Sequence, residues 1–565
     1  MKRNILYSKL IFIVLINTIA GSLYADNVSN NSVNLSLSWS KDDPVPTEIM
    51  NVSRMLREKF LADPYRPGYH FVIAEGMAIP GDGNGAFYAN GRYHLMYLYL
   101  ESTGTAWGHI SSKDMIHWRH HQDAIVPDPV SGEECSFSGG AFLDDDGTAY
   151  ISYWALGYPK LNDTDGVAFA KSNDYFYEKW EKFQQNPLIK SFKRGIAEVK
   201  DENGQKAIVG CADPSNIWKR DGKYYMLTGN LLVLREYGKD EDSPEIYKGD
   251  RLYLFESEDL LNWNYKGIFY DRRTDKSWTK DSEDNMCPSF LPLPDENGNK
   301  TGKHLLLFIS HNMGCQYYIG TYDIKNNKFL PEKHGRMSWV DNSYFAPEAL
   351  MAPDGRQIMW AWFNDRPKDH RKRGWCGVYG LPRSMWLGKD QTLHFEPIDE
   401  LKSLRFNQKK WNNIIVNGES SKKLDVVPGD SCELELVIDL KKTTAKQFGI
   451  RVRTSPGKEE ATPMYVDMDA GKLCVDTRNS GASGHRDHNV LEQAPFVPTE
   501  EQRKLTLRVF VDKSVVEIYA DTKQGIARRI YPLRDDSLGI ELFAEGGKAF
   551  FSEAKAWEMM PSNPY

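Results

Sequence analysis

Short runs of apolar and aromatic residues, closed by glycine turns, dominate the chain between residues 67 and 406. The clearest run, Tyr93-His94-Leu95-Met96-Tyr97-Leu98-Tyr99, follows the pair Asn90-Gly91, which is typical of a two-residue hairpin turn. The first strand of this hairpin, Ala86–Ala89, comes after three glycines that surround Asp82. Glycine lets the backbone turn sharply, so the pattern predicts a hairpin with an accessible carboxylate at its start.

The same order of small residues, strand, glycine turn and strand occurs four more times. These units start at Gly139, Asp213, Cys287 and Pro347, and their turn glycines are Gly147, Gly222, Gly302 and Gly355. Successive turn glycines lie roughly 50 to 80 residues apart, which leaves room for two further strands and matches the size of a propeller blade. The sequence therefore predicts an all-β fold with a five-bladed β-propeller over residues 67–406.

From residue 407 the pattern changes to strict alternation of apolar and polar side chains. Glu433-Leu434-Glu435-Leu436-Val437 and Leu505-Thr506-Leu507-Arg508-Val509 are examples. Strands of this period joined by short turns predict a β-sandwich over residues 407–565. Residues 26–66, ahead of the propeller, are expected to form a linker and one amphipathic packing helix, with apolar positions at Ile49, Val52, Met55, Leu56 and Phe60.

The first 25 residues have the three parts of a secretory signal. Basic residues in Met1-Lys2-Arg3 precede an apolar run, Leu10–Ala20, and small residues follow up to Ala25. A membrane anchor is the competing interpretation, but the apolar run is shorter than the ~20 residues that span a bilayer. We expect a mature chain that begins near Asp26 and is exported to the periplasm or the extracellular space.

Composition narrows the possible partners of the 565-residue chain. The net charge is -7 and there is no basic stripe, so a nucleic acid partner has no support, and no other stretch predicts a membrane span. The seven cysteines show neither metal-ligand spacing nor a disulfide pattern, and the sequence indicates no metal and no cofactor. The oligomeric state is left open.

Acidic residues stand at equivalent places in the repeated units. Asp82 and Asp213 each lie nine residues ahead of a turn glycine, and Glu283 and Asp284 precede the first strand of the fourth unit. The first strands of propeller blades line one central channel, so these carboxylates are expected to meet there. Paired carboxylates in one pocket are typical of glycoside hydrolases, which predicts an oligo- or polysaccharide substrate.

These segments resemble glycoside hydrolase family 32, the β-fructofuranosidases of the invertase, inulinase and levanase types, over nearly the whole mature chain. Gly81-Asp82-Gly83-Asn84-Gly85 is similar to the family's nucleophile motif, and Ala212-Asp213-Pro214 to its Arg-Asp-Pro motif. The resemblance implies a propeller followed by a sandwich, Asp82 as nucleophile and Asp213 as transition-state stabiliser. Segments around Trp107 and Phe137-Ser138 also match, which implies that Asn84, Trp107, Phe137 and Ser138 contact the sugar. The run 508–519 is similar to the family's C-terminal signature.

Three positions depart from the family pattern. Gly81 replaces a substrate-contacting Asn, Ala212 replaces Arg, and Met286 stands directly before Cys287, where the family has its acid/base Glu. We expect Glu283 or Asp284 to supply the proton instead. Glu283 is favoured for its longer side chain, and a like-charge neighbour such as Asp284 is expected to raise its pKa. Glu348 in the fifth unit is an outside candidate.

The resemblance implies a retaining hydrolase that cleaves β-fructofuranosidic bonds in sucrose or fructans. Asp82 attacks the anomeric carbon while an acid protonates the leaving oxygen, and water then releases the covalent intermediate. An inverting furanosidase acting on arabinose- or xylose-type glycans is an alternative, because the sugar contacts at 81 and 212 are lost. A non-catalytic carbohydrate-binding propeller is a second alternative.

Overall fold

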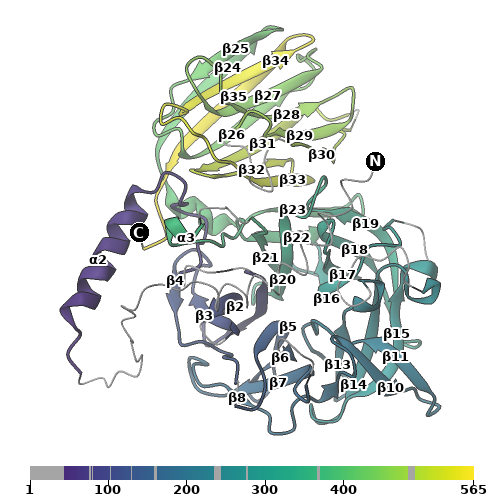
Figure 1. Ribbon diagram of the computed structural model, residues 1–565. Coiled ribbons are helices and arrows are strands. Elements are labelled where there is room, and N and C mark those ends of the chain that lie inside the picture. The colour runs from purple at the N-terminus through teal and green to yellow at the C-terminus, as the bar shows by residue number, and fades with distance from the viewer. Residues whose placement is uncertain are drawn as a thin grey trace, which may run out of the picture.

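The chain folds into a β-propeller followed by a β-sandwich, as predicted (Figure 1). The computed structural model describes residues 43–74, 78, 80–101, 104–128, 130–157, 162–234, 244–274, 278–365, 370–481, 490–499 and 501–564. The predicted signal, residues 1–25, lies outside these residues. The last propeller strand ends at Pro397 and the first sandwich strand begins at Arg405.

Five antiparallel sheets, whose strands follow one another in chain order, form the blades. The first blade contains β1 (Gly83–Ala89), β2 (Arg92–Glu101), β3 (Gly104–Ser112) and β4 (Trp118–His120). The second contains β5 (Cys135–Leu143), β6 (Ala149–Leu156), β7 (Gly166–Ser172), β8 (Glu181–Lys182) and β9 (Ile189–Lys190). The third contains β12 (Trp218–Arg220), β13 (Lys223–Thr228), β14 (Arg251–Ser257) and β15 (Asn264–Asp271).

The fourth and fifth blades complete the ring. The fourth contains β16 (Met286–Pro294), β17 (Lys300–Ser310), β18 (Gly314–Asp323) and β19 (Lys328–Arg336). The fifth contains β20 (Tyr344–Met351), β21 (Gln357–Phe363), β22 (Arg383–Leu387) and β23 (Leu393–Pro397). A separate hairpin, β10 (Ile196–Lys200) and β11 (Lys206–Gly210), joins the second blade to the third. Short 3-10 helices occupy connections, at Leu231–Leu234, Glu245–Tyr247, Arg272–Thr274 and Asp399–Leu404.

Bulges near the starts of the inner strands shape the channel. β1, β5, β16 and β20 each shift register against the second strand of their blade within a few residues of their start. Gly85, Cys287 and Ala346 at these bulges have positive φ, as does Asp213 ahead of β12. A bulge bends the strand and redirects the neighbouring side chains, which is how residues of different blades come to point at one another.

Hydrogen bonds join the first and fifth blades, whose described strands form two separate sheets. The Ala86 N–H donates to Glu348 Oε1 at 2.9 Å, and the Tyr379 hydroxyl donates to the Gly81 carbonyl at 2.8 Å. The segment ahead of β1 adds backbone bonds, because Phe71 accepts from Tyr379 N–H at 2.9 Å and Ile73 donates to Gly377 at 3.1 Å. Closure therefore depends on contacts of Phe71, Ile73, Gly81 and Ala86.

The sandwich consists of two six-stranded sheets that enclose an apolar core. One sheet contains, in spatial order, β24 (Arg405–Val416), β35 (Ala549–Met559), β26 (Ser431–Asp439), β31 (Lys504–Asp512), β32 (Val515–Ala520) and β33 (Gln524–Arg529). The other contains β25 (Ser420–Leu424), β34 (Gly539–Glu545), β27 (Gln447–Thr454), β28 (Thr462–Asp467), β29 (Lys472–Asp476) and β30 (Leu491–Pro495). The alternating pattern in the sequence corresponds to side chains that point into or away from this core.

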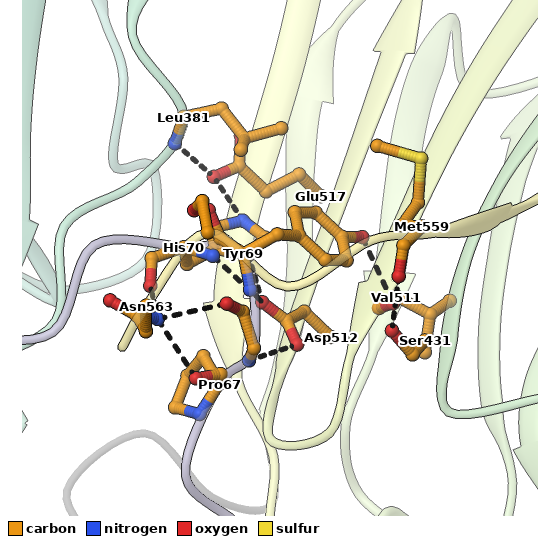
Figure 2. A network of polar contacts seen from close by, with 12 residues as sticks. Pro67, Tyr69, His70, Leu381, Ser431, Val511, Asp512, Glu517, Met559 and Asn563 are labelled. Atoms are coloured by element: carbon orange, nitrogen blue, oxygen red, sulfur yellow. Dashed lines mark hydrogen bonds and ion pairs between the residues drawn. The ribbon is translucent and has the colours of Figure 1, made fainter. Parts of the chain in front are cut away.

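A buried polar network joins the propeller to the sandwich (Figure 2). Asp512 accepts the backbone N–H groups of Gly68, Tyr69 and His70 at 2.7–2.8 Å and lies 3.0 Å from His70 Nδ1. Glu517 accepts the Leu381 N–H at 2.9 Å and lies 3.3 Å from His70 Nε2. Burial would lower the pKa of His70, but bonds to the two carboxylates outweigh it and raise that pKa. We call this network the Asp512 clamp.

Three histidines of the first blade form a second buried group. His94 Nδ1 lies 2.9 Å from His109 Nε2, and the rings of His109 and His121 stack with centroids 4.4 Å apart. Burial, aided by neighbouring positive groups, lowers the pKa of His94 to about 3 and that of His109 well below its usual value. These two imidazoles are neutral in the folded protein at pH 7.

The predicted helix is α2 (Thr47–Ala62), which lies on the outside of the molecule (Figure 1). It buries Phe60 alone, under the guanidinium of Arg66, while Val52 and Met55 are exposed. A second, short helix is α3 (His370–Arg373). No helix among the described residues is long and apolar enough to span a membrane. All seven cysteines are buried and unpaired with one another.

The Asp512 clamp is expected to carry much of the stability at the domain junction. Replacing Asp512 with Asn should lower the free energy of unfolding by about 3 kcal/mol, because three backbone donors and the His70 imidazole lose a buried carboxylate partner. Urea unfolding at pH 7 measures the loss. Asp425→Asn, at an exposed sandwich position, is the control and should change stability by less than about 0.5 kcal/mol; equal effects would contradict the assignment.

The histidine group is expected to make the fold acid-sensitive. The folded-state pKa values of His94 and His109 lie below the unfolded value near 6.5. The stability that the neutral imidazoles contribute is therefore fully present above pH 6.5, and it is lost as the pH falls toward the folded-state pKa values. At pH 5 the lowered pKa of each of these two histidines should reduce the free energy of unfolding by about 2 kcal/mol. His109→Gln should therefore lose less stability between pH 7 and pH 5 than the wild type in urea unfolding. The exposed His117→Gln control should keep the wild-type slope.

Candidate active site

Asp82 lies at the floor of the propeller channel, just ahead of β1. Its Oδ2 accepts the Ser138 hydroxyl at 2.7 Å and its Oδ1 accepts the Trp362 indole N–H at 2.8 Å. The side chains that hold it thus come from the second and fifth blades. Asp82 is only 7% exposed, so the expectation that the glycines present it openly is wrong: the glycines let neighbouring blades approach and hold it.

Asp213 shares this floor with Asp82, as the sequence predicted. The thiol of Cys287 lies 3.4 Å from Asp213 Oδ2 and 4.0 Å from Asp82 Oδ2, so it lies between the two carboxyl groups. Burial and the charge of Asp82 raise the pKa of Asp213 to about 7. Burial and both carboxylates raise the pKa of the Cys287 thiol, which therefore stays protonated and donates to Asp213.

The four residues expected to contact sugar have different environments. Ser138 bonds Asp82 directly, while Asn84 bonds the backbone on both sides, with Nδ2 donating to the Asp82 carbonyl at 3.1 Å and Oδ1 accepting the Gly139 N–H at 3.2 Å. Phe137 is half-buried beside Trp154. Trp107 is 0% exposed, and its indole donates to the Phe137 carbonyl at 3.1 Å. Trp107 is therefore a core residue that supports Phe137, and its predicted contact with the sugar does not fit the structure.

Glu283 is occupied by partners of its own blade. Arg336 on β19 donates to both carboxylate oxygens at 3.0–3.1 Å, and Gln316 on β18 donates to Oε2 at 2.8 Å. Burial would raise the pKa of Glu283, but the bonds and charge of Arg336 outweigh it and lower that pKa. The predicted raised pKa is thus wrong in direction, because the distant Arg336, not the adjacent Asp284, controls the charge. Glu283 is an ionised structural anchor and is unsuited to donate a proton.

Asp284 holds a histidine that the sequence analysis did not single out. His311 lies in the turn between β17 and β18; its backbone N–H donates to Asp284 Oδ1 at 2.9 Å, and its Nδ1 bonds Oδ2. Asp284 is buried, whereas the His311 side chain is 24% exposed. Burial would lower the pKa of His311, but the charges of Asp284, Asp213 and Asp82 outweigh it and raise that pKa.

Glu348, the outside candidate, closes the ring at the back of the site. Its Oε1 accepts the Ala86 N–H, and burial raises its pKa to about 8, so it is protonated at pH 7. It is 4% exposed and its carboxyl is bonded to the backbone of β1. This environment indicates a role in joining the first and fifth blades.

Packing accounts for the three departures from the family pattern. A Cβ at Gly81 would lie 3.1 Å from Trp362 Cε3, so the indole that holds Asp82 takes the space of a larger side chain. Ala212 is 0% exposed and Met286 is 1% exposed. A Cβ at Gly229 would lie 2.7 Å from Met286 Sδ, so the thioether packs against the third blade. These positions now belong to the core.

Sequence reasoning missed Trp362 and His311. Trp362 lies on β21, the second strand of the fifth blade, where an aromatic strand residue gives no local sign of contact with an acid of the first blade. His311 directly follows β17 and precedes Gly314, a turn glycine with positive φ. A histidine in such a turn between two blade strands could have been recognised in the sequence as a candidate site residue. Within the described ranges, no cluster of His, Cys, Asp and Glu side chains could hold a metal ion.

A groove of about 360 Å³ on the sandwich lies apart from these acids. Of its lining residues, Arg451 pairs with Glu545 at 3.0 Å, and Lys458 pairs at 2.9 Å with Glu541, which lies outside the lining. The convergence of carboxyl groups at the propeller axis, rather than groove size, therefore defines the candidate site.

Comparison with known proteins agrees with this architecture. Residues 77–397 match the model for the glycosyl hydrolases family 32 N-terminal domain, and residues 400–558 match the model for the family's C-terminal domain. Sucrose-6-phosphate hydrolase of Zymomonas mobilis is 26% identical over 90% of this chain and 94% of that protein. Levanase of Bacillus subtilis is 28% identical over 86% of this chain and 68% of that protein. Fructan 1-exohydrolase IIa of Cichorium intybus has a similar structure, with a TM-score of 0.74, 21% identity, and coverage of 88% of this chain and 98% of that chain.

The structural role of Glu283 predicts a large stability effect. Glu283→Gln should lower the free energy of unfolding by about 3 kcal/mol, because it leaves the Arg336 charge without its buried counter-ion. Thermal and urea unfolding provide the measurement. Glu296→Gln, which removes an exposed carboxylate on the same blade, is the matched control and should have little effect. Unchanged stability in Glu283→Gln would contradict the anchor assignment.

Proposed function

The chain belongs to glycosyl hydrolase family 32, and on that basis we propose that it hydrolyses β-fructofuranosidic bonds in sucrose or fructans, with Asp82 as the nucleophile. The names of its relatives support this substrate class, since they describe a sucrose-6-phosphate hydrolase, a levanase and a fructan exohydrolase. These relatives differ in the substrates that their names describe, and the proposal names the type of bond rather than one substrate.

The main support for the proposal is that the carboxyl groups of Asp82 and Asp213 lie on either side of the Cys287 thiol. Two buried carboxyl groups from different blades are held by Ser138, Trp362 and Cys287. Such a site can place one carboxylate beneath the anomeric carbon and use the other to bind sugar hydroxyls. A fixed nucleophile reacts faster because its orientation is set before the substrate binds.

In the proposed first step, an Asp82 oxygen attacks the anomeric carbon as the bond to the leaving oxygen breaks. A proton donor supplies the leaving oxygen with its proton, and the fructosyl group is left as an ester on Asp82. In the second step water attacks the same carbon and the Asp82 carboxylate is released. Two displacements at one carbon retain its configuration.

Asp213 is proposed to bind hydroxyls of the reacting sugar. Its pKa of about 7 means that near neutral pH it can act as a hydrogen-bond acceptor or, when protonated, as a donor. A neutral Asp213 also reduces repulsion with Asp82 while the site is empty. Sugar hydroxyls, which both donate and accept, suit this variable partner.

We also propose that the protein is exported. The support is the basic start, apolar run and small residues of positions 1–25, which have the order of a secretory signal. A periplasmic or extracellular location suits an enzyme whose substrates include polysaccharides.

Asp82→Asn should lower turnover at least 10³-fold on every substrate that the purified wild-type chain cleaves, because the amide is a poor nucleophile. Reducing-sugar release from sucrose, inulin, levan and arabinan provides the screen, and NMR of the first-formed sugar should show retained configuration. Asp425→Asn is the activity control.

Full activity in Asp82→Asn would eliminate the mechanism. Inversion, or cleavage of arabinan alone, would favour the inverting furanosidase, whereas oligosaccharide binding with no turnover would favour a non-catalytic binding propeller. Unfolding of Asp82→Asn should stay within about 1 kcal/mol of the wild type, so that lost activity reports chemistry.

A further inference from the structure

The proposed mechanism requires a proton donor, and the carboxylates expected to supply it are engaged elsewhere. Glu283 is ion-paired to Arg336, and Asp284 is buried against His311. Position 286 carries a methionine whose side chain lies in the core. Glu348 is bonded to the backbone of β1 at the ring closure.

We propose that His311, oriented by Asp284, is the general acid and base of this site. This inference rests on the proposed function, since it assigns the proton transfers of that same reaction. Asp284 binds the ring through Nδ1 and also accepts the His311 backbone N–H, so both the ring and the turn that carries it are fixed. The proton to be transferred is therefore on Nε2.

The depth of the side chains supports this division of roles. Asp82 and Asp213 are 7% and 6% exposed as whole residues, and the His311 side chain is 24% exposed whereas that of Asp284 is 0% exposed. A sugar attacked from the floor by Asp82 must direct its leaving group outward. The donor therefore has to be more accessible than the nucleophile, and the exposure of the His311 side chain agrees with this requirement.

Aromatic contacts connect His311 to the nucleophile. The ring of Phe345 lies 6.1 Å from that of His311 and 6.4 Å from that of Trp362, whose N–H holds Asp82. On its other side, Asn342 donates to the His311 carbonyl. The charged groups that act on the imidazole are Asp284, Asp213 and Asp82, and all three favour its protonated form.

The proton transfers balance over one turnover. The imidazolium gives its Nε2 proton to the glycosidic oxygen as the bond to the anomeric carbon breaks and the Asp82 ester forms. The neutral imidazole then takes a proton from the attacking water, whose oxygen bonds to the anomeric carbon as the ester breaks. Asp82 returns as a carboxylate and His311 as an imidazolium, and water is the co-reactant.

Substrates with different leaving groups test the proposal. His311→Ala and His311→Gln should lower kcat/KM on sucrose by about 10² to 10⁴-fold. On β-fructofuranosyl fluoride the loss should be less than about 10-fold, because fluoride is a good leaving group that needs little help from an acid. Azide should raise turnover of the fluoride by His311→Ala and yield a fructosyl azide. Equal losses on both substrates, or no loss on sucrose, would overturn the assignment.

The pH profile supplies a readout that a structural role would not change. Wild-type kcat/KM on sucrose should fall as the pH rises through the raised pKa of His311, and this limb should be absent from the His311 variants. Asp284→Asn should move the limb to lower pH, since it removes the nearest negative charge. His117→Gln is the matched control, because His117 Nδ1 also bonds a carboxylate, Asp114 at 2.8 Å, but on the exposed outside of the first blade.

The outcomes separate the two proposals. A wild-type protein that turns over neither sucrose, fructans nor the fluoride would refute the proposed function. Turnover by the wild type that survives in His311→Gln with its basic limb intact would refute only the role of His311. If both variants fail to fold, NMR titration of His311 in the wild type decides, because a pKa below 6.5 would contradict the proposal.

Discussion

The buried Asp512 clamp is the constraint on which the arrangement of this molecule depends. One carboxylate accepts three consecutive backbone N–H groups, at Gly68, Tyr69 and His70, and Glu517 binds both His70 and the backbone at Leu381. The first of these segments leads through the backbone bonds of Phe71 and Ile73 to Asp82. Because the segment ahead of β1 pairs with residues 377–379 of the fifth blade, the sandwich helps to fix where β1 starts. The second domain is thus part of the scaffold of the site.

The channel floor shows how environment gives like carboxyl groups different tasks. Asp82 is held by two neutral donors, Asp213 is raised in pKa by burial and by Asp82, and Glu283 is kept ionised by Arg336. Asp284 is used to orient an imidazole. The pKa of a buried acid depends strongly on the groups that contact it. The contacts of each carboxyl group, rather than its residue type, therefore decide whether it can transfer a proton near neutral pH.

The three departures from the family pattern, at Gly81, Ala212 and Met286, all replace a polar side chain with a small or apolar one. Trp362 fills the space beside Gly81 and bonds Asp82, while Met286 and Ala212 have become core residues. The contacts that hold Asp82, the proposed nucleophile, are present, whereas the polar groups expected at positions 81, 212 and 286 are absent. His311, in the turn between β17 and β18 of the fourth blade, would then supply the proton that the family's acid/base Glu supplies from the position of Met286.

The sequence by itself determined the architecture and half of the site. Local patterns such as Asn90-Gly91, the five turn glycines and the alternation in 433–438 specify hairpins and sheet faces, because backbone conformation and side-chain alternation are properties of neighbouring residues. Asp82 and Asp213 could be found because they occupy the same place in repeated units. Tertiary structure alone decided the rest. Glu283 lies beside Asp284 in sequence, but its charge is set by Arg336, 53 residues further on, and Trp107 is buried by a second blade. His311 gains its role only from Asp284, 27 residues earlier, because burial and ion pairing depend on contacts that the ring of blades creates.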